Sequence, residues 1–216
     1  MSEEATLITE RHVSYLTERT RAEDTFLRDL KREAAAAGIP SIWIAPAQAS
    51  FIQIVLTRGR ARAVVEVGTL AGYSAIVMAR ALPRDGQVRT IELEPRHADF
   101  AERWIARSDV AGKVEVLRGA GLEVLPRLAT DSADAAFLDA DKANYPNYLK
   151  ECLRIVRRGG LIMADNAFAF GELFADQPSD KEVAAMRRFN DLMAAEKSLD
   201  SIIVPFGDGL WVGVKR

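Results

Sequence analysis

The sequence has little of three things on which many binding sites depend: cysteine, histidine and a surplus of positive charge. Its 216 residues include one cysteine, Cys152, and two histidines. A single cysteine excludes both an intramolecular disulfide and a zinc site built on several thiolates. With 29 Lys and Arg against 31 Asp and Glu, the formal net charge is −2. We therefore expect no nucleic-acid partner and no membrane partner, since no overall positive field is present. The lone cysteine and the absence of a recognisable targeting segment favour a reduced, cytoplasmic setting.

The sequence also shows neither a signal peptide nor a clear membrane span. It begins MSEE, which is acidic and polar rather than basic. Residues 34–57 carry no charge and are long enough to cross a bilayer, but Pro40, Pro46 and several Ser and Gln residues interrupt them. A loop followed by a buried helix is the favoured interpretation of this segment.

What is present is an ordinary globular composition, with 49% hydrophobic and 28% charged residues. The length suits a single domain spanning residues 1–216. Residues 5–37 are expected to be helical but carry only a thin apolar stripe, formed by Leu16, Leu27 and Leu30. We expect residues 1–40 to form a helical N-terminal lid or a dimer arm.

From about residue 62, short apolar runs alternate with segments of helical periodicity. Strands are expected at residues 63–67, 87–93, 113–117, 134–138 and 161–164, and helices at 73–82, 95–107, 121–128, 145–156 and 181–196. Two final strands, at 201–205 and 210–214, flank Gly207-Asp208-Gly209, which is typical of a hairpin. The pattern predicts an α/β fold with a doubly wound, seven-stranded, mostly parallel, Rossmann-like sheet and a C-terminal antiparallel hairpin.

Ligands of such sheets bind at the carboxyl ends of the strands, and polar residues gather there. The loop Gly68-Thr69-Leu70-Ala71-Gly72 follows the first strand, and Glu92 ends the second. The glycines permit a tight turn close to a ligand, and Glu92 can accept hydrogen bonds from both ribose hydroxyls of a nucleoside. The spacing differs from the GxGxxG of NAD-binding loops, which favours a nucleoside without phosphates. The alternative is a plain turn beside a solvated glutamate.

Glu66 lies inside the first apolar strand, where an unpaired carboxylate is costly. It should therefore meet a cation or several hydrogen-bond donors, such as the ammonium group of a ligand. The alternative is a structural salt bridge with an arginine.

Asp139, Asp165 and Asn166 follow the fourth and fifth strands. Three hard oxygen ligands at one sheet edge suit Mg²⁺, or a similar divalent ion such as Ca²⁺ or Mn²⁺, whereas zinc usually takes His or Cys ligands. Helix capping by Asp and Asn is the alternative. Lys142, near a divalent ion, would have a depressed pKa and could act as a general base; a solvated loop lysine is the alternative.

These motifs resemble those of the cation-dependent O-methyltransferases, class I methyltransferases typified by the caffeoyl-CoA and catechol enzymes. The resemblance covers about residues 40–216 and rests on the segments VEVGTLAGYS (65–74 with Val65 first), TIE (90–92), FLDADKANY (137–145), GGLI (159–162), Asp165-Asn166 and PFGDGL (205–210). It implies methyl transfer from S-adenosylmethionine to a hydroxyl of a small catechol-type or phenylpropanoid-type acceptor. Relatives are often homodimers, so a homodimer is expected.

The resemblance also implies roles for individual residues. Glu66, Gly68, Thr69, Ser74 and Ile44 would surround the methionine end of the cofactor, Glu92 would bind the ribose, Ala120 and Gly121 would line the adenine pocket, and Asp141 would lie beside the cofactor. Asp139, Asp165 and Asn166 would ligate the metal. Lys142 and Asp139 are the expected catalytic residues, with Lys142 as the base.

Some features leave the acceptor open. Gln48-Ala49 stands where relatives have Gln-Gly, so the flap before the first strand could close differently. Phe168 and Phe170 could contact an aromatic acceptor or belong to the core or a dimer contact. Arginine clusters at residues 58–62 and 154–158 are either solvated or bind the phosphate of a CoA-bearing acceptor. The rival functions are an NAD-linked oxidoreductase and a catalytically inactive nucleoside-binding protein.

Overall fold

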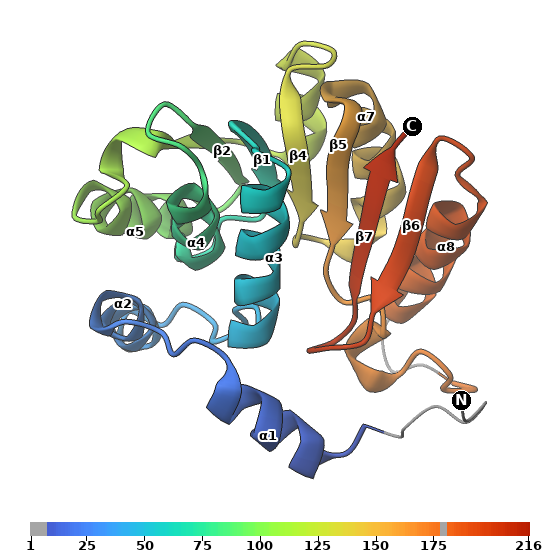
Figure 1. The fold of residues 1–216 in the computed structure, drawn as a ribbon, viewed down its shortest axis with the longest axis horizontal. Coiled ribbons are helices and arrows are strands. Elements are labelled where there is room, and N and C mark those ends of the chain that lie inside the picture. Colours follow the sequence, from blue (N-terminus) through green and yellow to red (C-terminus); the bar gives the residue numbers. More distant parts are fainter. Residues whose placement is uncertain (1–7, 178–180) are drawn as a thin grey trace.

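The computed structural model describes residues 8–177 and 181–216 and has the expected α/β architecture (Figure 1). Within these ranges seven strands form one sheet in the order β3-β2-β1-β4-β5-β7-β6. The strands are β1 (Ala63–Val67), β2 (Gln87–Glu92), β3 (Val114–Arg118), β4 (Ala133–Leu138), β5 (Val156–Ala164), β6 (Leu199–Val204) and β7 (Leu210–Lys215). The strands β1 to β5 pair in parallel, whereas β7 pairs antiparallel with both β5 and β6. The predicted sheet with its C-terminal hairpin is confirmed.

Helices pack on both faces of the sheet and build two hydrophobic cores. One core joins the sheet to α2 (Thr25–Ala36), α3 (Pro46–Arg58), α4 (Tyr73–Ala81) and α5 (Pro95–Ala106). The other joins it to α6 (Gly121–Val124), α7 (Tyr145–Ile155) and α8 (Lys181–Ala195). Side chains alternate along β1, so Val64 belongs to the first core and Val65 and Val67 to the second.

Four short 3₁₀ turns complete the described elements: η1 (Ala111–Lys113), η2 (Leu125–Arg127), η3 (Lys142–Asn144) and η4 (Ala169–Gly171). The helix expected at residues 121–128 ends at Val124, because Pro126 follows in the 3₁₀ turn η2. The third of these turns holds Lys142 directly after β4, which places the side chain at the carboxyl edge of the sheet.

The N-terminal segment differs from the single helix expected over residues 5–37. Two helices, α1 (Glu10–Arg19) and α2, are separated by an extended stretch, and Asp24 caps α2 by accepting a hydrogen bond from the Leu27 N–H. Residues 5–7 lie outside the described ranges. None of the described α1 side chains is buried, and Figure 1 shows α1 (blue) away from the sheet, beside one end of α3. No described helix has the length and apolar character needed to span a bilayer.

The fifth strand begins earlier than its expected start at residue 161. It runs from Val156, so Gly159 and Gly160 lie within β5 instead of ending the preceding helix. Gly160 has no room for a side chain, because a Cβ there would lie 2.7 Å from the Asp134 carbonyl oxygen. The pairing register with β4 shifts between Ala133 and Ala135 to accommodate this stretch.

Candidate active site

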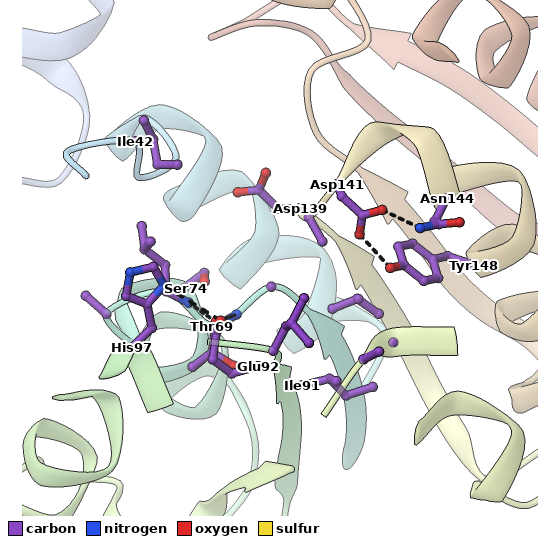
Figure 2. A pocket seen from close by; sticks show the side chains of 18 of the residues that line it. Ile42, Thr69, Ser74, Ile91, Glu92, His97, Asp139, Asp141, Asn144 and Tyr148 are labelled. Atoms are coloured by element: carbon purple, nitrogen blue, oxygen red, sulfur yellow. Dashed lines mark hydrogen bonds and ion pairs between the residues drawn. The ribbon is translucent and has the colours of Figure 1, made fainter. Parts of the chain in front are cut away.

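A cavity of about 350 Å³ opens at the carboxyl ends of β1, β2, β3 and β4 (Figure 2). Its wall is formed by residues 42–44, the glycine loop after β1, residues 91–93, residues 119–122 and the segment after β4. A cavity of this size accommodates a small-molecule ligand. The predicted cofactor-binding residues in its lining are Ile44, Gly68, Thr69, Ser74, Glu92, Ala120, Gly121, Asp139 and Asp141. Glu66 is the only predicted cofactor residue outside this lining.

Gly68 brings the glycine loop against the end of β4. Its φ of +102° favours glycine, and a Cβ at this position would overlap the backbone carbonyl of Asp139. The Asp139 N–H in turn donates to the Val67 carbonyl at 2.9 Å. The loop and the acidic residue that follows β4 are therefore held together by backbone contacts, which fixes this corner of the cavity.

Glu92 is buried and organises the same loop. One carboxylate oxygen accepts from the N–H groups of Thr69 (3.1 Å) and Leu70 (2.7 Å), and the other accepts from Glu94 N–H at 2.9 Å. At 8% exposed, Glu92 is not the solvated glutamate of the alternative interpretation. A carboxylate offers about four acceptor directions, so capacity remains for a ligand donor.

Glu66 is completely buried, and neither carboxylate oxygen has a hydrogen-bond partner among the described residues. Burial raises the pKa of this carboxyl group from 4.5 to about 8, although the nearby hydroxyls of Ser74 and Thr90 oppose the rise. The structural salt bridge with an arginine is therefore excluded in the described structure. Since Ser74 lines the cavity, Glu66 lies directly behind its wall.

Asp141 lies at the opposite end of the cavity, where two neighbours hold its carboxylate (Figure 2). The Tyr148 hydroxyl donates to one oxygen at 2.6 Å, and the Asn144 amide donates to the other at 2.5 Å. Gly121 faces the same tyrosine, because a Cβ there would lie 2.7 Å from the Tyr148 ring. These contacts join the segment that follows β3 to the segment that follows β4 in the cavity wall.

Lys142 is 5% exposed, so the solvated-lysine alternative is wrong. Its Nζ donates to Asp139 Oδ1 at 3.1 Å and to the Tyr145 hydroxyl at 2.8 Å, and that hydroxyl donates to the Leu138 carbonyl at 3.0 Å. Burial and the charge of Asp139 raise the Tyr145 pKa, which keeps the phenol neutral. Two contacts thus fix the position of the Lys142 amine beside Asp139.

Asp165 follows β5, the neighbour of β4, and is 6% exposed. Burial and then the charge of Asp139 raise its pKa to about 6, whereas a hydrogen bond from Gln48 Nε2 to Oδ1, at 2.6 Å, opposes the rise. Two neighbouring carboxylates that disfavour each other's charge form a pair that a hard divalent cation suits.

Asn166 adopts a left-handed φ of +65°, and its Nδ2 donates to Asp208 Oδ2 at 3.0 Å. Because an ionised carboxylate only accepts, the amide oxygen of Asn166 faces away from Asp208. Among residues 8–177 and 181–216, no three His, Cys, Asp or Glu side chains form a metal-binding group. The expected metal set therefore rests on two carboxylates and one amide, a donor chemistry that fits Mg²⁺ better than zinc.

Three polar residues of this region have no predicted role. Gln48 contacts Asp165, Asp208 contacts Asn166, and His97 lines the cavity with Nδ1 3.7 Å from Glu92 Oε1. His97 lies on a helix rather than at a strand end, so the strand-end rule cannot find it. Asp208 lies in the expected hairpin turn, which accounts for its sequence neighbours but gives no sign of its contact.

Comparison with known proteins adds to this geometry. A family model described as O-methyltransferase matches residues 17–216. The chain is 36% identical over 205 residues to a catechol O-methyltransferase of Niastella koreensis, covering 94% of this chain and 90% of the relative. A catechol O-methyltransferase of Mycobacterium tuberculosis is 37% identical over 169 residues, covering 78% of this chain and 76% of the relative.

Solved structures of O-methyltransferases are also similar to this chain. An O-methyltransferase of Bacillus cereus in complex with SAH superposes with a TM-score of 0.86 at 33% identity, covering 94% of this chain and 96% of the other. The O-methyltransferase of Streptomyces achromogenes involved in tomaymycin synthesis, in complex with SAM, has a TM-score of 0.84 at 28% identity and covers 94% of each chain.

Proposed function

Since this chain belongs to the O-methyltransferase family, we propose that it methylates a hydroxyl of a small catechol-type or phenylpropanoid-type acceptor, using S-adenosylmethionine and a divalent cation. The main supporting observation is the position of Asp139. It lines the cavity, and it also contacts Lys142 and lies near Asp165. We call the group Asp139, Lys142, Asp165 and Asn166 the acidic corner. A methyl donor in the cavity and an oxygen nucleophile in the corner would meet there in near-attack geometry.

The cavity lining supports assigning the cofactor's parts to it. Glu92, held by backbone donors, is the proposed ligand of the ribose hydroxyls, and Ala120 and Gly121 are the proposed adenine wall. Gly68, Thr69, Ser74 and Ile44 would surround the methionine end, with Glu66 behind them and Asp141 alongside the cofactor. The relatives solved with SAH and SAM support this choice of cofactor.

The acidic corner supports a role in activating the acceptor. Asp139, Asp165 and Asn166 would hold a divalent cation, Mg²⁺ before Ca²⁺ or Mn²⁺, which when bound lowers the pKa of a coordinated hydroxyl and orients it. Lys142 in its neutral form is the proposed base, and its contacts with Asp139 and Tyr145 hold Nζ in place to take the acceptor's proton.

The loop after β5 supports an aromatic acceptor. The Phe170 side chain is 52% exposed, and its ring centroid lies 6.0 Å from Lys142 Nζ. Phe168 instead packs against the backbone of Gly209. We assign Phe170 to the acceptor and Phe168 to the packing of the loop. The catechol O-methyltransferase names of two relatives support this substrate class.

We also propose a homodimer in which α1 acts as the arm, and a reduced, cytoplasmic setting. Val13, Tyr15 and Leu16 of α1 are each about half exposed, which leaves apolar surface for a second copy. Cys152 is free and buried, which fits a reducing compartment. Sedimentation of the full chain against a chain lacking residues 1–20 tests the dimer: the shorter chain should sediment as a monomer.

The test of the main proposal is methyl transfer from labelled S-adenosylmethionine to a panel of catechols, with Mg²⁺ or with a chelator. We expect transfer with Mg²⁺, loss of transfer with the chelator, and loss in Asp139→Ala but not in Asp200→Asn, an exposed carboxylate of β6. Undiminished transfer with the chelator would refute the metal role. Cofactor binding without transfer to any acceptor would support an inactive binding protein.

A further inference from the structure

The side-chain amide of Gln48 is 2% exposed and bridges two parts of the site. Its Oε1 accepts from the Ala45 N–H at 2.9 Å, and its Nε2 donates to Asp165 Oδ1 at 2.6 Å. Gln48 is the third residue of α3, and such residues often reach back to the backbone N–H at the start of a helix. The second bond is additional to this local role, since it reaches across 117 residues of sequence.

The orientation of this amide is fixed by its neighbours. A backbone N–H can only donate, so the oxygen of Gln48 must face Ala45 and the NH₂ group must face Asp165. Gly207, at φ +58°, packs directly against it: a Cβ there would lie 2.5 to 2.9 Å from the three outer atoms of the Gln48 side chain. The turn between β6 and β7 thus holds the amide in place from the other side.

The two partners of Gln48 belong to different halves of the proposed site. Ala45 directly follows Ile42, Trp43 and Ile44, which line the cofactor cavity. Asp165 is one of the proposed cation ligands. We call residues 42–45 the flap. The buried amide of Gln48 therefore joins this flap, which borders the proposed cofactor cavity, to Asp165, a proposed cation ligand.

We propose that Gln48 is a positioning residue that couples cofactor binding to cation binding, an inference that rests on the proposed function. A cation on Asp165 fixes that carboxylate, which fixes the Gln48 amide and in turn the flap backbone at Ala45. The cofactor then binds to a flap that is already ordered. By linkage, the cofactor raises cation affinity by the same factor.

The experiment measures the dissociation constant of S-adenosylhomocysteine by calorimetry, without and with saturating Mg²⁺. In the wild-type chain Mg²⁺ should tighten binding by roughly 5- to 150-fold, the usual range of such coupling. In Gln48→Leu the ratio of the two constants should fall to within about twofold of one. Gln53→Leu is the matched control, because Gln53 lies on the same helix but donates to the Val77 carbonyl, and it should keep the wild-type ratio.

A second variant changes a residue that packs against the Gln48 amide. Gly207→Ala displaces the Gln48 side chain without removing it and should also lower the ratio. A general loss of stability raises both dissociation constants by the same factor and leaves their ratio unchanged. The ratio therefore separates a loss of coupling from a loss of folding. The inference is wrong, and the proposed function stands, if the wild-type chain binds S-adenosylhomocysteine and Mg²⁺ without coupling, or if both variants retain the wild-type ratio. If the wild-type chain binds neither S-adenosylhomocysteine nor Mg²⁺, the inference and the proposed function are both wrong.

Discussion

Glu66 has a carboxyl group in the middle of a buried strand with no hydrogen-bond partner among the described residues. Its pKa is raised from 4.5 to about 8, chiefly by burial. The protonated form is therefore the one that folding favours. Its contribution to stability is fully present below about pH 4.5 and is lost as the pH rises through about 8. In the cofactor-free chain we expect the free energy of unfolding to fall across this window, by an amount on the order of a few kcal/mol.

Urea unfolding at pH 5.5 and pH 8.5 measures this fall. Glu66→Gln has no proton to lose at this position, so its free energy of unfolding should change less between the two pH values than that of the wild-type chain. Glu123→Gln, at an exposed position of α6, should retain the wild-type change. Equal changes in the wild-type and Glu66→Gln chains would show that Glu66 ionises as readily as an exposed glutamate.

Gly68 occupies a position in the cavity wall that has no room for a side chain. A Cβ there would overlap the Asp139 carbonyl, and the φ of +102° is itself unfavourable for any other residue. Gly68→Ala should lower the free energy of unfolding by about 2 kcal/mol or more and weaken binding of S-adenosylhomocysteine. Gly112→Ala is the control, because a Cβ there meets nothing within 4 Å. Thermal unfolding and calorimetry of both variants check the difference, and equal losses would contradict the steric argument.

Among single residues, the sequence predicts those site residues that directly follow the end of a strand. Glu92, Asp139 and Asp165 could be predicted because parallel strands present their carboxyl ends at one edge. Gln48 and Asp208 could not, because their contacts to Asp165 and Asn166 span 117 and 42 residues and leave no local pattern. Only the packed chain brings these partners together.

At the scale of elements, the turn between β6 and β7 supports the loop after β5. Asp208 Oδ2 accepts from Asn166 Nδ2 at 3.0 Å and from the Phe170 N–H at 2.8 Å. The loop itself has left-handed φ values at Asn166, Ala169 and Phe170, which these contacts help to maintain. The hairpin turn therefore sets the direction of the Asn166 amide, one of the proposed cation ligands.

Asp208→Ala should accordingly weaken Mn²⁺ binding, by about 10- to 100-fold, as is usual when the partner of a metal ligand is removed. Electron paramagnetic resonance of free Mn²⁺ measures the affinity directly. Asp200→Asn, on β6 of the same hairpin, removes a carboxylate that pairs with Arg216 at the surface and should leave the affinity unchanged. Unchanged Mn²⁺ affinity in Asp208→Ala would mean that Asn166 does not need Asp208 to be held in place.

The start of β5 and the break between α1 and α2 show why element boundaries were harder to predict. Residues 20–24 fall within the segment expected to be helical, yet they form no helix, and Asp24 both caps α2 and pairs with Arg80 at 2.9 Å. In β5, the glycine pair expected to end a helix lies within the strand, and Gly160 allows close contact with β4. In both places a tertiary contact outweighs the local preference.

At the scale of the whole molecule, the alternation of apolar strands and amphipathic helices was enough to predict the sheet and its hairpin. The two cores follow from the same alternation, because neighbouring residues of one strand face opposite sides. The central strands β1, β2, β4 and β5 contribute side chains to both cores, so we expect the two faces of the sheet to unfold together. This sharing supports the proposal that residues 1–216 form one domain.

Two tryptophans allow that proposal to be tested, because Trp104 packs in the core with α4 and α5 and Trp211 in the core with α7 and α8. We expect a chain retaining only Trp104 and a chain retaining only Trp211, with the other tryptophans replaced by Phe, each to unfold in a single transition. In each chain the urea midpoint from fluorescence should coincide with the midpoint from far-UV circular dichroism of that same chain. Each chain is its own reference, so any stability lost by the substitutions cancels. A fluorescence midpoint displaced from the dichroism midpoint in either chain would mean that one face unfolds before the other, and that the sheet does not join them into one cooperative unit.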